Sequence, residues 1–211
     1  RVAHPLIDLR VLGTRTVTVA NAATVGLGWG MFTTFLLIPA MVQGNGPHGF
    51  GADPTVSGWF LLPAAIGELL AGPVANPLTR RSSGRTVFAT GLGLASAALV
   101  ALATVHHAPA QVLAGTFVLG LGAGLAIQSA SVVVTQGVPA DKVGMSTTVN
   151  TTVRRFAGGI GSQVSAVILA TLVLGPGGEP ARSGFVVSFA VAAALAAVGA
   201  GLALRMVPTR G

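Results

Sequence analysis

The sequence contains no cysteine, and only 8% of its 211 residues are charged. The missing cysteines exclude a disulfide framework and any metal site built on thiolates. The shortage of charge excludes an ordinary soluble domain, because such a domain has about a quarter charged residues to cover its surface. Also lacking are a nucleophile with a neighbouring base, a phosphate-binding loop and metal-ligand spacing. No motif therefore indicates an enzyme, a metal site or a cofactor.

What the sequence does contain is apolar: 52% of the residues are hydrophobic, and 30 are glycine. This composition is typical of a membrane protein. The net charge of +7 comes from basic residues that sit between apolar runs, which suits anionic lipid headgroups better than nucleic acid. The excess of arginine over lysine, with abundant Ala, Gly and Val, suggests a GC-rich bacterial genome. Because the chain opens on Arg1 with no signal sequence, we expect a piece of a longer protein.

Hydropathy predicts six membrane-spanning helices. About twenty residues cross the roughly 30 Å hydrocarbon core, and clusters of glycine and proline separate the apolar runs. Residues 1–17 form a cytoplasmic lead-in and residues 208–211 a cytoplasmic tail, and kinks are expected at Pro63 and Pro73. The expected spans cover residues 18–42, 57–78, 86–105, 110–137, 146–174 and 185–207.

The basic residues support this topology. Six spans place both ends of the chain on one side of the membrane, and only Arg182 then falls on the opposite side. Positive residues mark the cytoplasmic side. The sequence therefore predicts a multi-pass protein of a bacterial inner membrane with both ends cytoplasmic. The residues on the cytoplasmic side are Arg1, Arg10, Arg15, Arg80, Arg81, Arg85, Lys142, Arg154, Arg155, Arg205 and Arg210.

An internal repeat relates the two halves of the chain. The glycine-rich run 26–30 of the first span returns at 120–124 of the fourth, and Ile-Gly at 66–67 returns at 160–161, both at an offset of 94 residues. Three spans intervene, so the repeats must cross the membrane in opposite directions. This pattern predicts a 3+3 inverted repeat, as in many secondary transporters.

Glu68 lies near the centre of the second span. A charge at this depth costs about 2.5–3.5 kcal/mol on insertion scales, so the carboxylate should face a cavity, a partner helix or a proton. A structural role, with Glu68 held between helices, is the plain alternative. We expect instead that Glu68 exchanges a proton during transport, because burial penalises its charged form.

Other polar residues in the spans are candidates for a substrate cavity or a gate. Packing is the alternative for each, since hydroxyls can bond their own helix and glycines allow close contact. One of Arg154 and Arg155 should snorkel to the headgroups while the other faces the inner mouth of the pathway, because adjacent helical positions point about 100° apart. The cavity candidates are Asn21, Trp29, Thr33, Gln128 and Ser131.

Three segments resemble the major facilitator superfamily. The run 72–78 with the basic residues after it is similar to that family's glycine–acid–basic loop signature. Segments 5–10 and 150–161 are similar to the C-terminal half of bacterial multidrug and proton antiporters of the fourteen-span branch. Two departures weaken the loop's charge network, since Asn76 stands at the acidic position and Pro77 at the next basic one.

The resemblance implies roles for the spans. Spans one and four would line a substrate cavity, two and five would face the other half, and three and six would face lipid. It also implies a cytoplasmic gate closed by ion pairs of the loop arginines. The gate candidates are Gly72, Asn76, Arg80, Arg81, Gly84, Arg85, Arg154 and Arg155.

We therefore predict an all-α membrane protein that forms one six-helix half of a major facilitator transporter. Its function would be proton-coupled efflux of small amphipathic molecules by alternating access, which needs the N-terminal half, the bilayer, substrate and protons as partners. The alternative is a truncated membrane module that packs with a partner and moves no solute. A nucleic acid, a metal and a cofactor are not expected.

Overall fold

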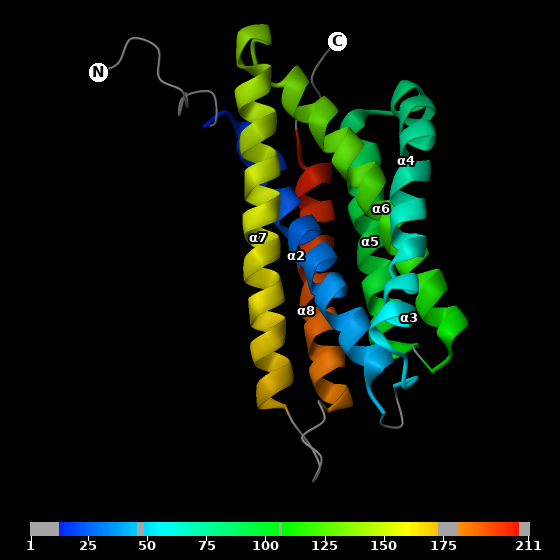
Figure 1. Cartoon of the computed structure of the whole chain (residues 1–211). Helices are drawn as coiled ribbons and strands as arrows, with labels where there is room; N and C mark the ends of the chain where they lie inside the picture. Colours follow the sequence, from blue (N-terminus) through cyan, green and yellow to red (C-terminus); the bar gives the residue numbers. More distant parts are fainter. Residues whose placement is uncertain (1–12, 46–48, 106, 173–180, 207–211) are drawn as a thin grey trace.

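The computed structural model describes residues 13–45, 49–105, 107–172 and 181–206, and these are entirely helical and loop structure. The expected lead-in and tail therefore lie mostly or wholly outside the described residues. Six long helices, one short α-helix and one 3₁₀ turn make up this part of the chain (Figure 1). They are α2 (Arg15–Gln43), α3 (Pro54–Trp59), α4 (Leu62–Arg81), α5 (Gly84–Thr104), α6 (Pro109–Gln136), η1 (Ala140–Lys142), α7 (Val143–Thr171) and α8 (Arg182–Leu204).

Local sequence signals fix where several of these helices begin. The Asp53 side chain accepts a hydrogen bond of 2.8 Å from the Val56 amide and so caps α3. Ser83 caps α5 in the same way through the Thr86 amide. Pro109 starts α6 at a position where its missing N–H has no partner to lose.

The expected single element over residues 57–78 is divided in the structure. A break at Phe60 and Leu61 separates α3 from α4, and Pro63 lies in the first turn of α4. Proline within a helix removes one hydrogen bond and clashes with the preceding turn, so the first turn of α4 is a favourable position for Pro63. Helix α4 nevertheless continues through Pro73 and Pro77.

Five described segments are long and apolar enough to cross a membrane. They are Arg15–Gln43, Pro54–Arg81, Gly84–Thr104, Pro109–Gln136 and Arg182–Leu204. Helix α7 is also 29 residues long, but threonines and the pair Arg154 and Arg155 make its first half polar. The six-helix, all-α architecture is confirmed, whereas the limits of each span within the bilayer stay a prediction.

The contacts between helices follow the same pattern in the first half of the chain as in the second. Helix α2 packs against α7 and α8, and its counterpart α6 packs against α4 and α5. The third pair, α5 and α8, packs together (Figure 1). Exchanging the first three long helices with the last three leaves this set of contacts unchanged. The inverted repeat is therefore present at the level of whole helices.

The glycine match at an offset of 94 residues does not join structurally equivalent positions. A Cβ on Gly26 would collide with the backbone of α8 at Leu195, so Gly120 of the repeat should meet α5. Gly120 instead meets α4 at Ala64, and Gly122 is the glycine that meets α5. The two residues of difference rotate the helix by about 200°, so the sequence match joins positions on different faces.

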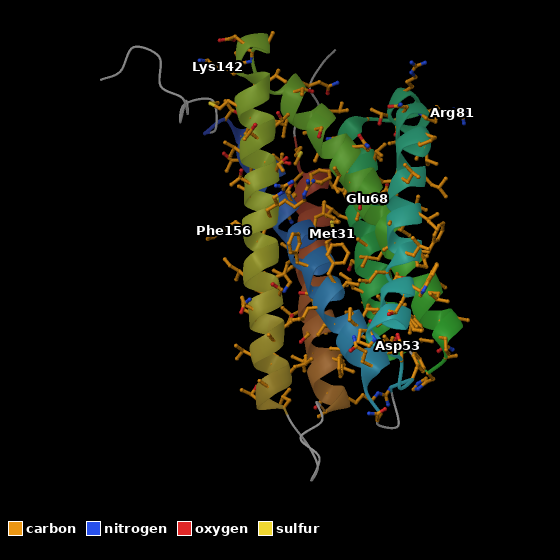
Figure 2. The ribbon with its side chains drawn as sticks, in the orientation of Figure 1. Met31, Asp53, Glu68, Arg81, Lys142 and Phe156 are labelled. Carbon is orange, nitrogen blue, oxygen red and sulfur yellow. The ribbon has the colours of Figure 1, made fainter. Side chains whose placement is uncertain are left out.

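The alternating helix directions gather basic residues at one end of the molecule, called the basic end below. Figure 2 labels Lys142 and Arg81 at this end and Asp53 at the opposite one. The helix limits also place Arg15 and Arg205 at the basic end. Arg182, at the start of α8, lies at the other end.

Candidate functional site: an apolar cavity with one carboxylate

A cavity of about 210 Å³ lies between α2, α4 and α6. Glu68 is the charged residue of its lining, and the other side chains are apolar. Figure 2 labels Glu68 and Met31 near the middle of the helix bundle. The lining consists of Met31, Phe35, Leu61, Ala64, Ala65, Glu68, Leu119, Gly120 and Ala123.

Small residues hold Glu68 at this place. Ala64, Gly67 and Ala71 form a buried stripe on α4 with spacings of three and four residues, which places them on one helix face. This stripe packs on Gly120 and Gly124 of α6, where a Cβ would meet the α4 backbone. The close approach fixes α4 against α6 and leaves Glu68 at the edge of the contact, half-buried.

Helix α7 presents a second stripe, which faces α2. Asn150 donates hydrogen bonds to Asn21 Oδ1 at 2.8 Å and to Thr24 Oγ1 at 3.1 Å. About four turns further along α7, the hydroxyls of Ser165 and Thr33 lie 3.2 Å apart. Polar contacts thus join α2 and α7 at two levels.

Arg154 lies within this stripe, four residues after Asn150. A Cβ on Gly28 of α2 would collide with the Arg154 backbone, so the two helices are close at this level. Arg154 is half-buried, and its charge is opposite to that of Glu68. Arg155 points to the exposed side of α7, beside a groove lined by Thr147, Thr148, Thr151 and Thr152. The expected difference in environment between the two arginines is present.

Three of the expected cavity residues lie in the contact of α2 with α7. Asn21 and Thr33 make the hydrogen bonds just described. Trp29 packs on Gly161, where a Cβ would lie 2.8 Å from its ring. In this structure these three side chains join helices, and their role toward a substrate stays a prediction.

The other two cavity candidates, Gln128 and Ser131, are exposed on α6. Ser131 follows Ile127 and the cavity residue Ala123 at spacings of four, so all three share one helix face. Its hydroxyl donates to the Ile127 carbonyl at 3.2 Å. This face extends from the cavity toward the basic end.

The gate candidates of the α4–α5 turn gather at the basic end. Arg80, Arg81 and Asn76 are exposed. Arg85 instead donates from Nη1 to the Met206 carbonyl at 2.8 Å, which ties the start of α5 to the end of α8. The last two gate candidates of this turn are glycines. Gly72 lies beside open space, and Gly84 packs on Val132 and Val133 of α6.

Sequence reasoning missed Asn150 and Ser165 as members of the site. The signal that finds them is the spacing of polar and small residues on α7, at 150, 154, 158, 161 and 165, which repeats every three or four residues. The hydropathy of α7 alone does not distinguish this stripe from the exposed threonines beside it.

Long apolar helices in alternating directions, an inverted repeat and a carboxylate in an apolar cavity define a multi-pass helical membrane protein. The chain belongs to the Major Facilitator Superfamily, whose family profile matches residues 18–211. Over 173 residues it is 28% identical to a protein named multidrug resistance protein B homolog from Mycobacterium tuberculosis H37Rv. Over 171 residues it is 25% identical to multidrug resistance protein Stp from the same species.

These relatives are much longer than the chain. The first match covers 80% of this chain and the second 81%, but each covers only 31% of the relative. The family, the helical membrane fold and the relation to proteins named for multidrug resistance are thus established.

Proposed function

We propose that the chain is the C-terminal six-helix half of a fourteen-span transporter that exports small amphipathic molecules in exchange for protons. The observation that carries this proposal is Glu68, a carboxylate placed midway along the segment Pro54–Arg81 on the wall of an apolar cavity. An ionisable group at this depth is costly and marks a transport or proton pathway in most membrane proteins. The names of the relatives support a drug-like cargo.

The N-terminal half is the proposed partner of two apolar helix faces. Leu69 of α4 is 76% exposed and Phe156 of α7 is 72% exposed. Figure 2 shows Phe156 pointing away from the bundle at the edge formed by α7. In a complete transporter the second half would cover these faces and close the open side of the cavity, which places Glu68 at the interface between halves.

The proposed orientation puts the basic end in the cytoplasm of a bacterial cell. The described basic residues at this end, Arg15, Arg81, Lys142 and Arg205, support it through the positive-inside rule. Arg80 and Arg81 are exposed there and are free to form gate contacts with the other half.

The experiment that tests the function is dye efflux from membrane vesicles that contain the full-length parent protein. A pH gradient should drive efflux of a fluorescent cationic dye in the wild type, and Glu68→Gln should lose this pH-driven component. Asp141→Asn is the matched control, because it removes an exposed carboxylate in the loop before α7 and should leave efflux unchanged.

Both outcomes are informative if the variant reaches the membrane at the normal level. Unchanged pH-driven efflux in Glu68→Gln would make Glu68 structural and place the proton site in the other half. A parent protein that moves no dye under any gradient would instead favour the alternative, a membrane module that packs with a partner without transporting a solute.

A further inference from the structure

Glu68 and Arg154 are two oppositely charged residues that lie beside one face of α2, near the middle of the bundle. Glu68 lines the cavity with Met31 and Phe35 of α2. The backbone of Arg154 in α7 lies against Gly28 of α2. Gly28 and Met31 are three residues apart, so they belong to neighbouring turns of one helix face. The carboxylate and the guanidinium therefore belong to residues that meet α2 at neighbouring turns of the same face.

The position of Arg154 is held by its neighbours. Asn150, one turn earlier, makes two hydrogen bonds to α2, and Gly158, one turn later, packs against the Gly28 carbonyl. Contacts on both sides of Arg154 therefore keep its turn of α7 against α2. Glu68 is held in the same way by the contact of Gly124 with the α4 backbone.

Other charges near Glu68 lie at the ends of helices. The segment that forms α6 contains no charged residue. Arg80 and Arg81 are twelve and thirteen residues from Glu68 on α4, about 18 and 20 Å along the helix axis. The remaining charges on the helices that pack against α4 or line its cavity are Arg15 at the first residue of α2, Arg85 in the first turn of α5, and Asp53 before α3.

We propose that Arg154 is the counter-charge of Glu68 and competes with a cationic cargo for it. The inference rests on the proposed function, since it assumes that Glu68 receives a cation. A monovalent cation that enters the cavity can be neutralised by the one carboxylate there, and the charge of Arg154 then repels it across a region of low dielectric. Arg154 thus lowers the affinity for cations and limits the site to cargo that can displace it.

The cargo class that this arrangement selects is a small aromatic or aliphatic monocation. The apolar lining binds its body, and Glu68 binds its charge. A neutral molecule of the same shape gains binding free energy from the apolar lining only. Its binding should not depend on Arg154, and this difference separates charge competition from a change in the shape of the cavity.

The test measures binding of N-methyl-4-phenylpyridinium to the purified full-length parent by equilibrium dialysis. Arg154→Gln should tighten binding by at least about fivefold, the lower limit of typical coupling between two sites. Arg155→Gln is the matched control, since it removes the same charge from the exposed side of the same helix. This control and Arg154→Lys should stay within about twofold of the wild type, and uncharged 4-methylbiphenyl should bind all variants alike.

Two outcomes would overturn the proposal. One is an equal effect of Arg154→Gln and Arg155→Gln, which would indicate a general effect of net charge. The other is an effect of Arg154→Gln that persists in a Glu68→Gln background, where no carboxylate remains to be competed for. The proposal requires the effect to vanish there.

A second readout applies if the parent binds no cation, in which case the proposed cargo fails but the charge pair can still be tested. Glu68→Arg and Arg154→Glu should each lower the melting temperature in detergent, because each places two like charges beside the same face of α2. The double variant should recover most of the loss. Additive losses in the double variant would show that the two residues do not interact.

Discussion

Asn150 is the side chain that most directly joins α7 to α2. Its amide donates to Asn21 and Thr24, and it is 5% exposed. Asn150→Ala should lower the free energy of unfolding by about 0.6 kcal/mol and at most about 1.7 kcal/mol, the average and the maximum for polar contacts between membrane helices. The measurement is thermal unfolding of the purified protein in detergent.

Gln163 provides the control for this prediction. It lies on the exposed side of the same helix, so Gln163→Ala should change the melting temperature little. Equal effects of the two substitutions would mean that the hydrogen bonds of Asn150 add nothing beyond helix propensity.

At the residue scale, the sequence identifies a candidate residue better than it identifies that residue's neighbours. Glu68 is conspicuous because a carboxylate in an apolar run is costly at membrane depth. That Arg154 meets the same face of α2 depends on the packing of three helices, and no local pattern encodes that packing. Asn21 and Thr33 show the same limit, because polar side chains in a span can face either a cavity or a neighbouring helix.

At the scale of elements, glycine decides how closely the helices approach. A Cβ on Gly91 of α5 would lie 2.6 Å from the Ala126 amide nitrogen of α6. Gly91→Ala should therefore push the two helices apart and reduce the free energy of unfolding by about 1–3 kcal/mol, as for overpacked cores. Thermal unfolding in detergent measures this loss.

Gly93 is the matched control, two residues further along α5. Among the described residues, no atom outside the adjacent backbone of α5 lies within 4 Å of a Cβ built there, and the gain in helix propensity from Gly93→Ala is up to about 1 kcal/mol. We expect an unchanged or higher melting temperature. A destabilised Gly93→Ala, with Gly91→Ala unaffected, would contradict the assignment of the close face.

The elements themselves are largely predictable from the sequence, because hydropathy and proline spacing are local signals. Six long helices and the basic segregation follow from them. The break at Phe60 and the shift of the glycine register do not, since both depend on what each turn of helix meets. A glycine-rich run has small residues on several faces, so similarity between two such runs does not show which faces correspond.

At the scale of the whole molecule, the orientation in the membrane is open to direct test. Ser82 lies in the α4–α5 turn at the basic end, and Ser183 lies near the start of α8 at the other end. In a parent protein freed of other cysteines, Ser82→Cys should react with a membrane-impermeant maleimide only in inverted vesicles. Ser183→Cys should react only in intact cells. Labelling of both from one side would exclude the six-span topology.

The helix pairing also determines when the fold can form during synthesis. Helices α2, α4 and α5 make few contacts with one another, and the main partners of α2 are α7 and α8, which are made last. The first three helices therefore enter the membrane without a bundle of their own. The turn of α2 around Gly26 stays uncovered until α8 arrives, so a ribosome that stops before α8 releases a product without the contact that buries Gly26.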